Sequence, residues 1–124
     1  MKKTKSKMII TERGTKKWIK NKQLHREDGP AVEYKDGTKE WFLNGKMHRE
    51  DGPAVEYKDG TKMWFKNNKL HRLGGPAVEY KDGTKAFYLN GKEYTEKQFY
   101  KPKKLTLDEI IDILGYPIII VKSH

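Results

Sequence analysis

The sequence has no cysteine, and it has serine only at Ser6 and Ser123. The first absence excludes disulfides, a thiolate nucleophile and Cys-based zinc sites, and it fits a reducing compartment. The second argues against a serine nucleophile, because both serines lie in terminal segments. No apolar run approaches the roughly 20 residues of a membrane span, and no apolar signal core follows the basic N-terminus. These absences predict a cytoplasmic protein that does not enter the membrane.

Apolar residues are also scarce, at 35% of the chain, which equals the share of charged residues. A chain of 124 residues with this composition predicts one domain with a thin core. Aromatic residues nevertheless reach 11%. Because each aromatic side chain can bury a large area, we expect an ordered chain.

The main feature that is present is a 23-residue repeat. The segment HREDGPAVEYKDGTK occupies residues 25–39 and 48–62, and an altered copy, HRLGGPAVEYKDGTK, occupies residues 71–85. A unit this short cannot bury a core alone, so the copies must stack into one quasi-linear object. Such an object presents a long surface, which favours a binding function.

Each repeat contains two hairpin signals, which in one unit are Asp36-Gly37 and Asn44-Gly45. Both dipeptides are typical of two-residue type I′ turns. They separate three predicted strands, at residues 31–34, 38–43 and 46–49. The predicted fold is therefore mainly β, a repetitive antiparallel β-meander of about ten to twelve strands in a single twisted sheet.

The predicted turns fix the register, and the register fixes the faces of the sheet. Two-residue loops place Tyr34 opposite Lys39 and Val32 opposite Trp41. Repetition then gives three columns on one face: Trp18, Trp41, Trp64 and Phe87; His25, His48 and His71; Tyr34, Tyr57 and Tyr80. We expect this face to be the core, with Trp41 and Trp64 largely buried. The alternative is an aromatic groove that stacks a flat or extended ligand.

The C-terminal part departs from the repeat and predicts a small α/β cap. Thr106 and Glu109 form a capping box before an apolar helical pattern at residues 107–114, and Gly115 suits the position after the helix. A short helical turn is predicted at residues 96–100.

The apolar run from Ile118 to Val121 predicts a final buried strand. The chain then divides into three parts: a basic N-terminal arm with a first strand (1–13), four repeats (14–94) and the C-terminal cap (95–124).

The net charge of +10 is concentrated near the N-terminus. Residues 1–24 carry nine Lys or Arg and one Glu, whereas each later 23-residue block is close to neutral. A lysine-rich arm attracts polyanions in a salt-dependent way, but it is also a common solubilising tail. The candidate arm residues are Lys2, Lys3, Lys5 and Lys7.

The string His-Arg-Glu-Asp is the one most suggestive of catalysis, but it occurs intact twice, at residues 25–28 and 48–51. A catalytic site is normally single, so repetition favours a scaffold role. In that role the aspartate accepts backbone N–H groups in its turn and the histidine packs on a tryptophan. Histidines of successive repeats are expected about 14 Å apart, too far to share a metal ion. We therefore predict no enzyme, no metal site and no cofactor.

The string Leu43-Asn-Gly-Lys46, followed by His48-Arg-Glu-Asp-Gly-Pro-Ala54, resembles a short repeat of bacteriophage and large-virus proteins. It is more distantly similar to MORN repeats, which are β-hairpin units with Tyr, Trp and Gly at set places. The resemblance covers residues 14–93. It implies a MORN-like sheet, a non-catalytic array and, for a viral protein, a role in host interaction such as inhibition of a bacterial defence system. The inserted His-Arg-Glu-Asp string departs from the MORN pattern, so a lipid role is not carried over.

Together these features predict a non-catalytic binding module whose partner is a host protein. The candidate contacts are Arg26, Arg49 and Arg72 with the histidine and tryptophan columns, because arginine and tryptophan are enriched at hot spots. One alternative is a nucleic-acid or nucleotide binder that uses the lysine arm and these arginines. Another is a self-assembling structural protein that associates through the run from Ile118 to Val121.

Overall fold

The computed structural model of the protein describes residues 5–101 and 106–115. Within them, fourteen strands and two helices follow in chain order. The strands are β1 (Lys7–Ile10), β2 (Lys16–Lys20), β3 (Gln23–Leu24), β4 (Val32–Glu33), β5 (Lys39–Glu40), β6 (Phe42–Leu43), β7 (Lys46–Met47), β8 (Val55–Glu56), β9 (Lys62–Met63), β10 (Phe65–Lys66), β11 (Lys69–Leu70), β12 (Val78–Glu79), β13 (Lys85–Leu89) and β14 (Lys92–Tyr94). The helices are α1 (Glu96–Tyr100) and α2 (Leu107–Leu114).

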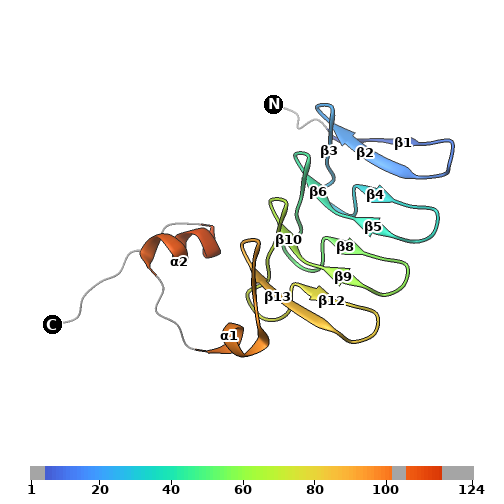
Figure 1. Ribbon diagram of the computed structural model, residues 1–124. Coiled ribbons are helices and arrows are strands. Elements are labelled where there is room, and N and C mark those ends of the chain that lie inside the picture. Colours follow the sequence, from blue (N-terminus) through green and yellow to red (C-terminus); the bar gives the residue numbers. More distant parts are fainter. Residues whose placement is uncertain (1–4, 102–105, 116–124) are drawn as a thin grey trace.

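The predicted mainly β, antiparallel meander is confirmed. Ten strands form one open sheet, in which neighbouring strands run from β1 at one end to β14 at the other. The pairs β6–β7 and β10–β11 form separate two-stranded hairpins. Figure 1 shows the repeats stacked one above another, each with two hairpins that extend in different directions. The strand count exceeds the predicted ten to twelve because the strand expected at residues 38–43 is interrupted at Trp41.

The first turn of each repeat is one residue longer than predicted. Tyr34 N–H donates to Thr38 O, and Gly37 N–H donates to Tyr34 O. The loop therefore has three residues, and Gly37, with φ +99°, takes the left-handed position that follows a type I turn. Asp36 Oδ1 accepts a hydrogen bond from Thr38 N–H at 2.8 Å. This local bond favours the longer loop over the predicted type I′ turn.

The longer loop shifts the register by one residue. Each side chain of the strand after the turn therefore lies on the face of the sheet opposite to the predicted one. Val32 pairs with Glu40, not with Trp41, and Glu33 pairs with Lys39. One face of the sheet consequently carries an unbroken alternation of charge from strand to strand: Lys16, Glu33, Lys39, Glu56, Lys62, Glu79 and Lys85. Opposite charges in direct cross-strand pairs stabilise the sheet modestly at each step.

The second turn of each repeat is confirmed. Phe42 pairs with Met47 and Leu43 with Lys46, which leaves Asn44 and its neighbour as a two-residue loop. Asn44 has φ 50° and the following glycine has φ 78°, as a type I′ turn requires.

Small alanine and valine side chains form most of the core, and of the predicted column of Trp18, Trp41, Trp64 and Phe87 only Phe87 belongs to it. The buried apolar side chains are Ala31, Val32, Ala54, Val55, Ala77, Val78 and Phe87. The expected burial of the tyrosine column is wrong, because Tyr34, Tyr57 and Tyr80 are 39%, 42% and 43% exposed. The tryptophans are half-buried. The register shift accounts for the difference, since the buried valine pairs with residue 40 of the strand and not with the tryptophan beyond it.

The C-terminal helices are also confirmed, each with its capping box. Gly115 adopts the left-handed conformation with φ 79°, and its N–H donates to Ile111 O. Phe87 of the last repeat packs on α1, with ring centroids 4.9 Å from Phe99 and 5.6 Å from Tyr100. The strand predicted from Ile118 to Val121 lies outside the described residues.

The aspartate turns predict a pH-dependent stability. Hydrogen bonds from the threonine two residues later hold the pKa of Asp36, Asp59 and Asp82 below the usual value of 3.8. A lowered pKa in the folded state stabilises the fold above the unfolded pKa, and this stabilisation is lost as the pH falls through the folded pKa. We expect the triple Asp→Asn variant to lose less thermal stability between about pH 7 and pH 2 than the natural protein, measured by scanning calorimetry. Equal losses in the two proteins would contradict the turn assignment.

Candidate functional site: the repeated His-Arg-Trp clusters and the N-terminal hollow

Each repeated arginine lies over the tryptophan of its own repeat. The distances from Cζ to the indole centroid are 3.8 Å for Arg26 over Trp18, 3.9 Å for Arg49 over Trp41 and 3.9 Å for Arg72 over Trp64. A planar guanidinium attracts the face of an indole and shields it from water. An arginine therefore covers one face of each of these three tryptophans.

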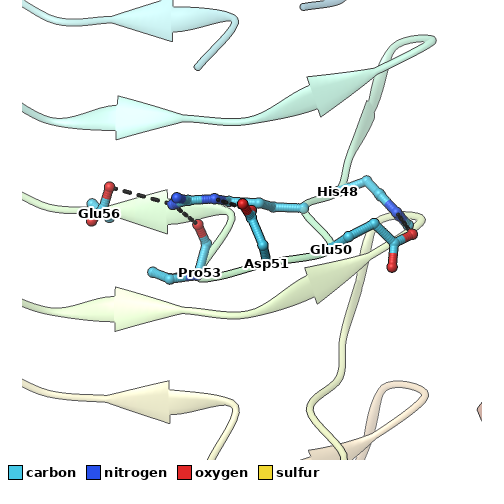
Figure 2. Close-up of polar contacts among 6 residues, drawn as sticks. His48, Glu50, Asp51, Pro53 and Glu56 are labelled. Carbon is cyan, nitrogen blue, oxygen red and sulfur yellow. Dashed lines mark hydrogen bonds and ion pairs between the residues drawn. The ribbon is translucent and has the colours of Figure 1, made fainter. Parts of the chain in front are cut away.

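The arginine head group is held in place by oxygen atoms of the following loop and strand. Arg49 Nε donates to Asp51 Oδ1 at 3.0 Å, and its Nη1 donates to the Pro53 carbonyl at 3.0 Å and lies 3.6 Å from Glu56 Oε2 (Figure 2). The aspartate was expected to accept backbone N–H groups, but it accepts the guanidinium instead. Only 23% of the Arg49 side chain is exposed, so little of it faces outward.

A glycine makes room for this arrangement. A Cβ atom on Gly52 would lie 2.9 Å from Arg49 Cζ, closer than carbon atoms tolerate. Gly29 has the same relation to Arg26, at 3.0 Å. In the altered third repeat the contact is looser, because a Cβ on Gly75 would lie 3.4 Å from Arg72 Nη1. The Gly-Pro dipeptide that follows His-Arg-Glu-Asp thus allows the arginine to fold back.

The repeated histidines connect one repeat to the next. All three are buried, and Nδ1 of each accepts a backbone N–H from the second turn of the following repeat. These bonds are His25 to Asn44 at 2.8 Å, His48 to Asn67 at 3.2 Å and His71 to Asn90 at 2.8 Å. The sequence predicted packing on a tryptophan and local use of the ring nitrogens, and it did not reveal this partner 19 residues away. Because Nδ1 is an acceptor, the proton of the neutral ring lies on Nε2.

The Nε2 atom has a different environment in each repeat. His48 Nε2 meets Glu50 Oε1 at 2.6 Å, in the pair drawn in Figure 2. His25 Nε2 lies 3.5 Å from Glu27 Oε1, and it is buried without a hydrogen bond. Burial lowers the pKa of His71, and the nearby positive charge of Lys66 lowers it further. A hydrogen bond with the backbone of Ile113 in α2 acts in the opposite direction, but the net shift is downward.

A hollow of about 410 Å³ lies at the N-terminal end of the array, beside His25. It is lined by Lys5, Ser6, Trp18, Lys20, His25, Arg26, Glu27 and Asp28. Three cations and two carboxylates therefore share it, together with His25 Nε2–H, which makes no hydrogen bond to any of the described residues. This set can hold a small polar or anionic group. Ser6 closes part of the hollow, since its hydroxyl donates to His25 O.

The candidate residues are therefore only partly brought together. Lys5 joins the first His-Arg-Trp cluster at the hollow, whereas Lys7 begins β1. The clusters of the second and third repeats remain separate from it, each within its own unit. Lys2 and Lys3 lie outside the described residues. Among the residues that are described, no group of three His, Asp or Glu side chains is arranged to hold a metal ion, and no helix is long and apolar enough to cross a membrane.

Comparison with known proteins identifies no relative. No family model, no curated protein and no solved structure matches the chain.

The close approach of Gly52 to Arg49 predicts a specific effect of one added methyl group. Gly52→Ala should displace the guanidinium from Trp41 and lower the free energy of unfolding by about 1 kcal/mol, the range of a partly exposed cation–π contact. Gly75→Ala is the matched control, because its nearest arginine atom lies at an ordinary contact distance of 3.4 Å. Urea unfolding followed by tryptophan fluorescence measures both. Equal effects at the two glycines would contradict the stacking role.

The histidine bond predicts a loss of stability that is independent of the exposed glutamate. His48→Ala removes the acceptor for Asn67 N–H and should lower the free energy of unfolding by about 1–3 kcal/mol. Glu50→Gln should change it by less than about 0.5 kcal/mol, because the Glu50 side chain is 81% exposed. Chemical denaturation of both variants tests this, and an unaffected His48→Ala protein would show that the inter-repeat bond is dispensable.

Proposed function

We propose that the protein is a non-catalytic repeat module that binds a protein partner. The observation that carries this proposal is the use of the repeated His-Arg-Asp side chains inside the array. Arg49 is held by Asp51 and Pro53, and Arg26 is held by Asp28 and Pro30 with nearly the same distances. Side chains that make the same scaffold contacts in successive repeats support binding by a stable surface rather than chemistry at one centre.

The exposed tyrosine row supports a protein contact. Tyr34, Tyr57 and Tyr80 occupy the same position in successive repeats and are 39–43% exposed. Burial and a hydrogen bond to Glu40 raise the pKa of Tyr34 to about 12, so its hydroxyl stays protonated. Neutral, amphipathic tyrosine side chains are enriched in protein interfaces. The resemblance to phage-type repeats further suggests a partner in the host cytoplasm, such as a component of a bacterial defence system.

A nucleic-acid or nucleotide binder is the second candidate, favoured by the N-terminal hollow. Lys5, Lys20 and Arg26 line it beside Trp18, and cations next to an aromatic ring are the usual means of holding a phosphate and a base. The two carboxylates in the same hollow disfavour a polyanion. The third candidate, self-assembly through the run from Ile118 to Val121, concerns residues outside those described.

Salt-dependent binding separates the first two candidates. We expect random DNA and RNA to bind only weakly at roughly 150 mM salt, with dissociation constants no tighter than about 10⁻⁶ M in filter binding. A Lys20→Glu variant should then leave capture of a host protein from nuclease-treated lysate nearly unchanged, because rim charges act mainly on association rate. Nanomolar binding to nucleic acid that this substitution abolishes would overturn the protein-partner proposal.

A further inference from the structure

The first strand of the sheet has an open edge. β1 lies at the end of the strand order, and no residue in the described ranges pairs with its outer side. Thr11 N–H donates to Thr15 O, and Trp18 N–H points away from β1 to Ala31 O. Because backbone groups alternate along an antiparallel strand, Lys7 and Ile9 bond to β2, while the N–H and C=O groups of Met8 and Ile10 point outward.

The side chains of this edge strand are unusually apolar for their exposure. Met8, Ile9 and Ile10 are 46%, 47% and 60% exposed. Edge strands are normally protected by charges, proline or a covering element. At the other end of the sheet, α1 contacts both β13 and the edge strand β14. At the first repeat, by contrast, the array ends on three exposed apolar side chains and a row of unused backbone groups.

The charge around β1 determines which chain can complete the edge. Residues 1–24 carry nine Lys or Arg and one Glu, so edge-to-edge pairing with a second copy would bring two strongly basic regions together. Such like-charge pairing is unfavourable. A nucleic acid satisfies the charge but offers no partner for Met8, for the isoleucines, or for an alternating row of peptide groups. An extended polypeptide that alternates acidic and apolar residues satisfies all three requirements.

We propose that β1 is a strand-addition site for an extended acidic segment of the protein partner, an inference that rests on the proposed function. The partner strand would bond to the outward backbone groups of Met8 and Ile10. Its apolar side chains would cover those two residues, and its carboxylates would meet Lys5 and Lys7 at the start of the strand. Addition of a strand to an open edge needs no rearrangement of the sheet.

Proline at the outward position provides the sharpest test. Ile10→Pro removes an outward N–H without removing a bond to β2, because proline is compatible with the free side of an edge strand. Ile10→Ala is the matched control, which shortens the side chain but keeps the N–H. The probe is a short synthetic peptide of alternating Glu and Val, measured by fluorescence anisotropy and by hydrogen exchange of the Met8 and Ile10 amides.

We expect the peptide to protect both amides, and Ile10→Pro to weaken its binding about tenfold more than Ile10→Ala does. Peptide binding that is absent, or that Ile10→Pro leaves unchanged, would overturn the proposal. If Ile10→Pro does not fold, Met8→Glu/Ile10→Glu serves instead, because it keeps both N–H groups and repels an acidic strand. Dimerisation through β1, or equal protection by an RNA oligonucleotide, would also overturn the proposal.

The same variants distinguish failure of this site from failure of the proposed function. Host protein that is captured equally by the natural protein and by the folded β1 variant shows that the module binds a protein elsewhere, so that only the strand-addition site is wrong. If nuclease-treated lysate yields no captured protein even for the natural sequence, the proposed function itself fails.

Discussion

The structure depends on hydrogen bonds in which side chains of one repeat accept backbone N–H groups of the next repeat. His25 Nδ1 accepts the N–H of Asn44, and Thr38 Oγ1 accepts the N–H of Lys58 at 3.1 Å. Both threonine and histidine are buried where they do this. Buried polar groups without a partner are costly, so the histidine and the threonine of one repeat need the turns of the next one. These polar contacts therefore hold successive repeats together in addition to the strand pairing and the small alanine and valine core.

The same requirement makes the two ends of the array chemically different from its middle. At the C-terminal end, helix α1 packs against Phe87, and the backbone of Ile113 in α2 engages His71. The glutamate of the His-Arg-Glu-Asp string is replaced there by Leu73. At the N-terminal end, His25 Nε2 remains unbonded beside a hollow, and β1 leaves its outer edge open. The hollow and the open strand edge therefore both lie where stacking stops.

Much of the fold follows from the sequence, because its period and its turn residues are local signals. Asn44 and the glycine after it specified their turn, and Thr106 with Glu109 specified the start of α2. The register of the first hairpin was wrong by one residue, since Asp-Gly is compatible both with a two-residue turn and with a three-residue loop closed by an aspartate bond to Thr38. Because of this one-residue difference, the core is formed mainly by Val32, Val55 and Val78 with the neighbouring alanines, and not by the aromatic columns that the sequence predicted.

The candidate site could be predicted less well, because it depends on contacts between distant residues. The placement of Arg49 over Trp41 and the bond from His48 to the next repeat have no signature in a single unit. The repeated Gly-Pro is a local signal for this arrangement, since a side chain at Gly52 would collide with the folded-back arginine. The open edge of β1 follows from topology, which composition and spacing do not reveal.

The contact between His71 and α2 also removes an ambiguity that identical repeats create. Residues 25–39 and 48–62 have the same sequence, so a chain displaced by one whole repeat would form nearly the same contacts during folding. Misassembly between equivalent units is a characteristic failure of repeat proteins. Leu73 and Gly74 break the equivalence, because only the histidine beside them lacks its own glutamate and engages the terminal helix instead. The altered third copy thus distinguishes the last histidine from the other two, so that α2 packs at the end of the array.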